Sequence, residues 1–262
     1  MKNWEILNSR DRTAINSVIE EWNELLSKNL SEHKYQKFIS SHAGLFFGDV
    51  DVFIVINKMK FSIEKEWDFV IVRDGYSRGT IYEFIEIKRP QDRLFNKNGI
   101  PSKALQIAID QTIARRDWLK TEKKYFQKYL PTTNTRVVSD SNLKFKIIIG
   151  RSENIPTLLE KRSLYMSELG IEIRSFDYLS SLVSNRLFFN WALLHYVAGT
   201  EKISPTKLNQ LANPFFKAVT DSQWRSFCEK RIPTFHLYSR IIDEVIALRT
   251  YNKLQDKIRT LR

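Results

Sequence analysis

Hydrophobic residues in the first fifty positions recur at the spacing of an amphipathic helix. In residues 11–28 they fall at every third or fourth position. A second helix is predicted over residues 32–47, with Ser31 as its N-cap. The apolar positions of the first helix are Ile15, Ile19, Trp22, Leu25 and Leu26.

The pattern changes to strands between about residues 50 and 90. Three runs rich in β-branched and aromatic residues predict three strands, at residues 50–56, 67–73 and 80–90. The turn-forming dipeptide Asp74-Gly75 separates the last two runs. We therefore expect these two strands to form a hairpin.

Between about residues 100 and 176, predicted helices alternate with predicted strands. Helical spacing returns at residues 102–128, with Ser102 as the expected N-cap. Two buried strands, at residues 144–150 and 170–176, then flank a helix over residues 156–169. This order predicts an α/β fold in which a mixed central sheet is flanked by helices on both faces.

The composition changes again after about residue 180. The remaining chain is helical in pattern and rich in aromatic residues. We therefore predict two parts, residues 1–180 around the sheet and a C-terminal helical extension over residues 181–262. The extension has two interpretations: its helices cover a sheet face within one subunit, or they hold a homo-oligomer together.

Composition narrows the class of protein. An apolar fraction of 42% and an aromatic fraction of 13% predict a folded chain with a sizeable core. Cys228 is the single cysteine, which excludes an internal disulfide and a Cys-rich zinc site. The N-terminal residues have no apolar signal region, and no run approaches the roughly 20 apolar residues of a membrane helix. We expect a cytoplasmic protein that does not enter the membrane.

The net charge of +12 is compatible with nucleic-acid binding. A basic surface attracts phosphate groups because binding releases counterions from the nucleic acid. Charge alone does not separate this interpretation from that of a soluble basic protein.

Candidate chemistry lies on two of the predicted strands. Side chains alternate along a strand, so Glu86 and Lys88 share one face with Tyr82 and Phe84. Asp68 interrupts the preceding apolar strand in the same way. Charged groups in such surroundings are paired, bound to a metal or placed at a cleft.

These residue types suit phosphodiester hydrolysis. Carboxylates hold Mg²⁺, which keeps several waters and accepts a phosphate oxygen as a further ligand. A bound metal also lowers the pKa of water, while a lysine offsets the charge of the transition state. The alternative is a surface hairpin in which Asp68 and Glu86 pair with Lys88 as ordinary salt bridges.

The order of these residues resembles a nuclease signature. Asp68, a spacer and then Glu86-Ile87-Lys88 is similar to the D…ExK signature of the PD-(D/E)xK nuclease superfamily. Residues 32–42, with Glu32 and Gln36 one helical turn apart, resemble the E-x-x-x-Q-x-F-L helix of the Shedu family.

Further segments extend the resemblance to Shedu nucleases over roughly residues 20–180. Lys88-Arg89-Pro90 matches the K-x-P that follows the catalytic strand, and residues 147–151 and 173–179 resemble the closing strands. Residues 108–115 resemble the A-x-x-Q-x-x-x-Y element, with Arg115 where the tyrosine is expected.

The resemblance implies a Mg²⁺-dependent DNA endonuclease in bacterial anti-phage defence, with Mn²⁺ as a substitute and with a restriction-endonuclease-like core. It also implies a homo-oligomer. In this site Asp68 and Glu86 hold the metal, and Glu32 adds a ligand directly or through water. Lys88 positions the nucleophile and Gln111 orients the site. Gln111 is expected within the stripe formed by Ala104, Ile107, Gln111, Ala114 and Trp118.

A basic run on the following helix predicts a contact surface for double-stranded DNA. Lysines and arginines interleaved with aromatic residues are suited to phosphate contacts. The alternative is a solvated basic helix. The residues of this run chosen as DNA contacts are Arg115, Arg116, Lys120, Lys123 and Lys124.

Two other functions stay open at the level of sequence. The same fold could serve as a catalytically silent DNA-binding or assembly module, although the intact Asp68, Glu86 and Lys88 disfavour it. A restriction-like nuclease outside phage defence would use the same chemistry. The four histidines lack zinc-site spacing, and no Gly-rich phosphate loop is present.

Overall fold

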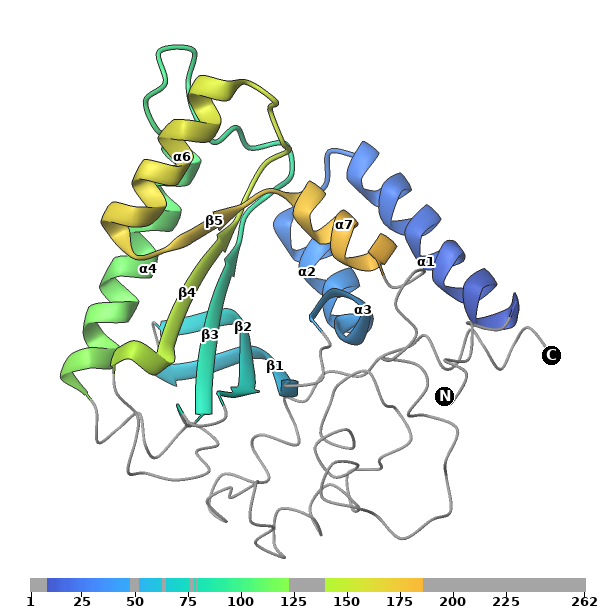
Figure 1. Ribbon diagram of the computed structural model, residues 1–262, viewed down its shortest axis with the longest axis horizontal. Coiled ribbons are helices and arrows are strands. Elements are labelled where there is room, and N and C mark those ends of the chain that lie inside the picture. Colours follow the sequence, from blue (N-terminus) through green and yellow to red (C-terminus); the bar gives the residue numbers. More distant parts are fainter. Residues whose placement is uncertain are drawn as a thin grey trace, which may run out of the picture.

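The computed structural model describes residues 9–47, 52–62, 65–75, 78, 80–122 and 140–185. These contain a five-stranded sheet and helices on both of its faces (Figure 1). The helices are α1 (Ser9–Ser27), α2 (Glu32–Ser41), α3 (Ala43–Phe47), α4 (Lys103–Thr121), α6 (Pro156–Leu169) and α7 (Phe176–Asn185), with a short 3-10 helix, η3 (Asp140–Asn142). The strands are β1 (Val52–Ser62), β2 (Lys65–Asp74), β3 (Thr80–Ile87), β4 (Leu143–Ile148) and β5 (Glu172–Arg174).

The sheet is mixed, as predicted, and its strands lie in the order of the sequence. β1, β2 and β3 are antiparallel, and the predicted hairpin joins β2 to β3 with Asp74 paired to Thr80. β4 and β5 then run parallel to β3. Parallel neighbours require crossover connections, and α4 and α6 provide them.

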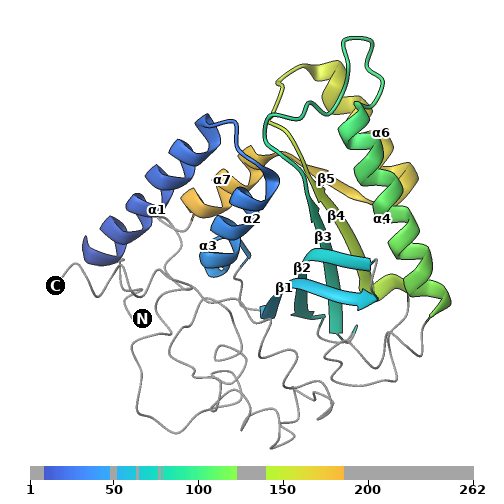
Figure 2. The ribbon, with the colours of Figure 1, turned by 180° about the vertical axis from the view of Figure 1, so that it is seen from behind.

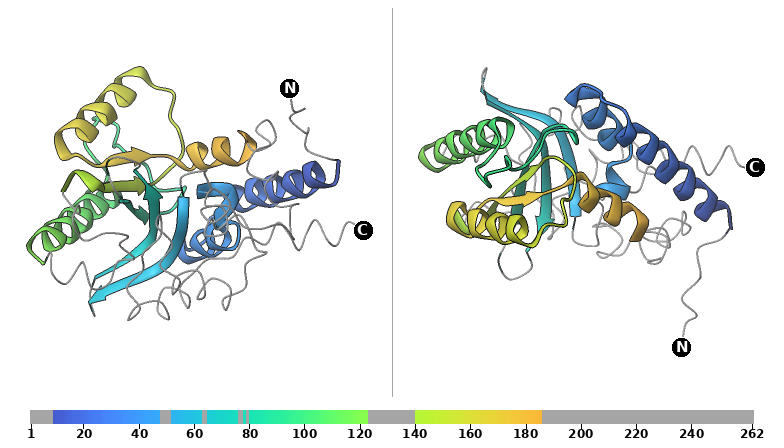
Figure 3. Two further views of the ribbon diagram at one scale, coloured as in Figure 1. Left: turned by 60° about the horizontal axis from the view of Figure 1, so that its bottom comes forward. Right: turned by 90° about the horizontal axis from the view of Figure 1, so that it is seen from above.

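Two hydrophobic clusters hold the helices on the sheet. Tyr82 and Phe84 of β3 join the cluster beneath α4 and α6. Ile85 and Ile87 join the cluster beneath α1, α2, α3 and α7. Figures 2 and 3 show these two groups of helices on opposite sides of the strands. The alternation predicted for β3 is therefore confirmed.

The prediction of one helix over residues 32–47 is wrong in one respect, because the structure has two helices there, α2 and α3, separated at His42. The backbone N–H of His42 donates to Phe38 and Ile39, and a separate helix, α3, follows. The change of direction lets Phe46 pack on Trp22, with ring centroids 4.9 Å apart. Phe47 then reaches Phe69 of the sheet at 5.3 Å.

α4 differs from its prediction in its buried face. Ser102 caps it as expected, accepting from the N–H of Leu105, and the helix extends to Thr121. The last part of the predicted helix, residues 123–128, lies outside the described residues. Ile107, expected in the core stripe, is 43% exposed. The buried positions are Leu105, Ala108, Ile109, Thr112 and Leu119.

The predicted division between residues 180 and 181 falls inside α7. Phe176, Leu179 and Val183 of this helix are buried in the same cluster as α1. The rest of the predicted C-terminal extension lies outside the described residues. Among the helices that are described, none combines the length and the apolar character needed to cross a membrane.

Candidate active site

The site begins where β2 and β3 separate. Their ladder ends at the pair Phe69 and Ile85, one residue short of Asp68 and Glu86. The N–H of Ile87 instead donates to Oδ2 of Asp68 at 2.8 Å. The side chain of Asp68 thus takes the place of a backbone acceptor, which fixes its carboxylate beside the end of β3.

Glu86 and Lys88 meet on the α4 side of the sheet. Nζ of Lys88 lies 2.8 Å from Oε1 of Glu86, and it also donates to Oε1 of Gln111 at 3.0 Å. Gln111 comes from α4, so the crossover helix holds the lysine against the strand. The predicted proximity of these residues is present in the structure.

Glu32 reaches the same group of side chains from the first turn of α2. Its Oε1 accepts from Nε2 of Gln36 at 2.9 Å, and its Oε2 lies 3.8 Å from Nζ of Lys88. The structure therefore brings together all five residues proposed for catalysis. Glu32 stands beside the lysine rather than directly beside both other carboxylates.

Lys58 belongs to the site, although the sequence analysis did not propose it. Its ammonium pairs with Asp68 and lies 3.4 Å from Glu66. The residue has a φ of 55°, in the left-handed region that non-glycine residues rarely adopt. The pairing of Asn57 with Phe69 and Met59 with Trp67 places it opposite Asp68. Knowledge of the register between β1 and β2 would have identified Lys58 as the neighbour of Asp68.

Arg115 also points into the site rather than along an outer DNA-binding face. Its guanidinium pairs with Oε2 of Glu86 and lies 5.2 Å from the ring centroid of Trp67. Gln111 and Arg115 are one helical turn apart on α4, so the helix presents both to the end of β3. Spacing from Gln111 could have indicated this position.

Burial controls the electrostatics of the carboxylates. Asp68 is 5% exposed and Glu86 is 4% exposed. Burial raises the pKa of Asp68, and the nearby Glu86 carboxylate raises it further, against the opposing effect of Lys58. Burial likewise raises the pKa of Glu32, with Lys88 opposing. Burial would lower the pKa of Lys58, but Asp68 and Glu66 together outweigh this effect and the pKa is raised.

The carboxylate oxygens of the site are the type of ligand that a magnesium ion prefers. In the described part of the chain, no three His, Cys, Asp or Glu side chains are grouped so as to hold a metal. Mg²⁺ does not require three, since it is commonly bound by one or two carboxylates with waters and substrate phosphates. Asp68 and Glu86 meet this lower requirement, and the raised pKa of Asp68 reflects a buried charge that a cation would stabilise.

The predicted DNA contacts on α4 point in different directions. Arg115 is in the site, whereas Arg116 donates to the carbonyl of Leu169 at 2.6 Å. Lys120 is exposed near the end of the helix. Lys123 and Lys124 lie outside the described residues.

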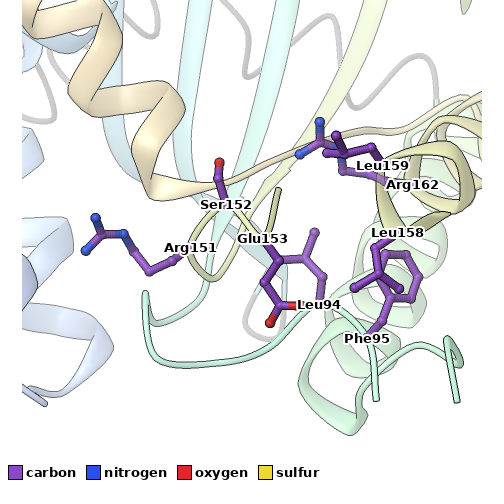
Figure 4. A pocket seen from close by; sticks show the side chains of 8 residues that line it. All are labelled: Leu94, Phe95, Arg151, Ser152, Glu153, Leu158, Leu159 and Arg162. Atoms are coloured by element: carbon purple, nitrogen blue, oxygen red, sulfur yellow. The ribbon is translucent and has the colours of Figure 1, made fainter. Parts of the chain in front are cut away.

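Two hollows lie near the loop that follows β3. The larger, of about 350 Å³, is lined in part by residues 90–93 of this loop, and the residues that line it include none of the site. The smaller, of about 20 Å³, is shown in Figure 4, where Arg151 points away from the apolar Leu94 and Leu158. It is large enough for about one water molecule. The larger hollow is lined by Leu26, Pro90, Gln91, Asp92, Arg93, Arg151 and Glu153.

Fold and site together define an α/β protein with a mixed sheet, whose buried carboxylates and lysine gather where two strands diverge. Residues 29–180 match the family described as "Shedu protein SduA, C-terminal". This segment covers more than half of the 262 residues and contains every residue of the site, so the chain belongs to the Shedu family. The family is associated with nuclease activity in anti-phage defence. None of the curated proteins matches the chain.

Proposed function

We propose that this protein is a metal-dependent endonuclease that cuts or nicks double-stranded DNA in anti-phage defence. One observation above all supports the proposal. Two carboxylates, Asp68 and Glu86, are buried at the divergence of β2 and β3, with Lys88 in contact with the second. Membership of the Shedu family supports the setting in defence. The motif also supports a place in the PD-(D/E)xK superfamily.

Asp68 and Glu86 would hold the magnesium ion, with Mn²⁺ as a substitute. When bound, the ion polarises the phosphate and makes a coordinated water more acidic. Lys88 contacts both Glu32 and Glu86, and we assign Glu32 a contact with the metal ion through water.

Lys88 is assigned the orientation of the attacking water. Its side chain is 14% exposed, so it stays accessible to a substrate while anchored by Glu86 and Gln111. The water oxygen forms a bond to phosphorus and the bond to the leaving oxygen breaks. The attacking water gives up one proton to the solvent, and the leaving oxygen takes one up from it. The positive charge of Lys88 offsets the negative charge that develops on the phosphate oxygens.

Gln111 is a positioning residue in this mechanism. Its neutral amide oxygen accepts a hydrogen bond from Lys88. It therefore holds the ammonium in place without changing the net charge of the site. Such supporting hydrogen bonds commonly affect activity by about 10–100-fold.

The net charge of +12 supports DNA as the substrate. A basic chain gains affinity for the backbone of DNA without reading its sequence. We assign Lys120 to contacts with DNA phosphates, and the same role predicted for Lys123 and Lys124 falls outside the described residues.

Incubation of supercoiled plasmid with the purified protein tests this function. With Mg²⁺ we expect relaxed or linear DNA, and with the metal chelated we expect none. Equal cleavage with and without the metal would contradict a metal-dependent mechanism. Intact plasmid under all divalent-ion conditions would contradict a nuclease acting on this DNA.

A further inference from the structure

Both carboxylate oxygens of Glu86 are in contact with cationic side chains. Lys88 lies 2.8 Å from Oε1, and Arg115 pairs with Oε2. The carboxylate is 5% exposed, so water does little to weaken either contact. The ring centroid of Trp67 lies 5.2 Å from the guanidinium, in the range of a cation–π contact.

The charges of the site nearly cancel. Its carboxylates belong to Glu32, Glu66, Asp68 and Glu86, and its cations to Lys58, Lys88 and Arg115. A divalent ion added to this group would leave an excess of positive charge. Because both oxygens of Glu86 already contact cations, an ion that binds Glu86 has to displace one of them.

Arg115 is the cation best placed to give way. Lys88 is anchored by Gln111 as well as by Glu86, whereas the only ion pair described for Arg115 within the characterised residues is with Glu86. A guanidinium keeps its charge at all ordinary pH values, so it does not leave by losing a proton. It has to move.

We propose that Arg115 competes with the divalent ion for Glu86 and thereby sets the metal affinity of the site. The inference rests on the proposed metal-dependent function and assigns Arg115 a role beyond contact with DNA. Removing its charge leaves a buried carboxylate with one cation fewer, which attracts Mg²⁺ more strongly. The metal-free protein gives up some stability in exchange, and added Mg²⁺ restores it.

Titration calorimetry on the full chain with Mg²⁺ alone tests the proposal. A charge in contact with a carboxylate changes its proton affinity by about 10- to 1,000-fold. We therefore expect Arg115→Gln to bind Mg²⁺ at least about tenfold more tightly than the wild type. Arg115→Met, whose apolar stem also packs on Trp67, gives the same result if the glutamine variant folds poorly.

Two further variants separate charge from packing and from distant electrostatics. Arg115→Lys keeps the charge but loses the planar group over Trp67, and we expect its Mg²⁺ affinity to stay near that of the wild type. Lys103→Gln removes one charge from the exposed start of α4, roughly 18 Å away along the helix axis, and should leave the affinity unchanged. The rise in melting temperature caused by Mg²⁺ should be larger for Arg115→Gln than for the wild type.

The outcomes distinguish this inference from the function on which it rests. Equal Mg²⁺ affinity in the wild type, Arg115→Gln and Arg115→Met overturns the competition while leaving metal-dependent cleavage intact. If Arg115→Lys binds Mg²⁺ as tightly as Arg115→Gln does, the effect is due to packing and not to charge. This result also overturns the competition. Absence of Mg²⁺ binding in every variant overturns both the competition and the proposed metal site.

Discussion

At the scale of single residues, Gln111 offers a way to perturb Lys88 without changing charge. We predict that Gln111→Met slows DNA cleavage by about 10–100-fold, because the ammonium loses one of the two contacts that hold it. DNA affinity should stay the same. Single-turnover cleavage, measured beside a binding titration, gives both quantities. Gln106→Met, at an exposed position on the same helix, is the matched control and should cleave normally.

The raised pKa of Asp68 predicts how metal binding depends on pH. Protonation removes the charge that holds the ion, so Mg²⁺ affinity should be full above the raised pKa and fall as the pH drops through it. Because burial, with the charge of Glu86 adding to it, raises this pKa, the fall should begin above the ordinary value of 3.8. Calorimetric titrations at several pH values measure it. A constant affinity down to that ordinary value would contradict the prediction.

Part of the site could be predicted from local sequence, and part could not. The alternation of β3 placed Glu86 and Lys88 on one face, and the site formed as that pattern indicated. Lys58 was missed because its contact with Asp68 depends on the register between β1 and β2. Arg115 was predicted as a DNA contact, and its pairing with Glu86 was missed because its position depends on how α4 lies over β3.

At the scale of elements, a band of alternating charges crosses four strands on the sheet face opposite α4. Arg73 pairs with Glu83, Glu83 with Lys146, and Lys146 lies 3.2 Å from Glu172. Glu172 then lies 2.5 Å from Arg174. The central pair is the most buried, with exposed fractions of 8% for Lys146 and 10% for Glu83.

We predict that Lys146→Met lowers the free energy of unfolding by about 3 kcal/mol or more, because Glu83 keeps a buried charge with one partner fewer. Urea denaturation measures the change. Lys144→Met, on the same strand at an exposed position, should have little effect. Equal stability of the two variants would show that the band contributes little.

The same lysine gives the stability a pH dependence. Burial would lower the pKa of Lys146, but Glu83 and Glu172 outweigh it and the pKa is raised above 10.5. A raised pKa means that its contribution is complete below 10.5 and is lost as the pH rises through the raised value. The wild type should therefore lose stability in that alkaline range, and Lys146→Met should lack this loss.

The elements themselves were largely predictable, and the exceptions have physical causes. The spacing of apolar residues along the sequence correctly predicted three strands followed by alternating helices and strands. The break at His42 did not follow from spacing, because apolar residues continue at helical intervals beyond it. It arises from tertiary packing, where Phe46 must reach Trp22 while Phe47 reaches the sheet.

At the scale of the whole molecule, we predict a homo-oligomer held in part by the region after α7. One site cuts one strand at a time, so cutting both strands of a duplex is served by two sites in a symmetric assembly. Light scattering of the intact chain should give a multiple of the mass of one chain. A version ending after Asn185, which retains all of α7, should have a smaller multiple. A monomeric intact chain at micromolar concentration would contradict the prediction.

Cleavage of supercoiled plasmid in Mg²⁺ by Lys88→Met, compared with the wild type, tests the central claim most directly. The side chain touches Glu86 and Gln111 at the end of β3, and it is assigned to the chemistry rather than to the core. We predict a loss of at least about 100-fold in cleavage rate, with circular dichroism and DNA affinity retained. Lys103→Met, at the exposed start of α4, should cleave as the wild type does. Cleavage by Lys88→Met at the wild-type rate would contradict the assignment of this site.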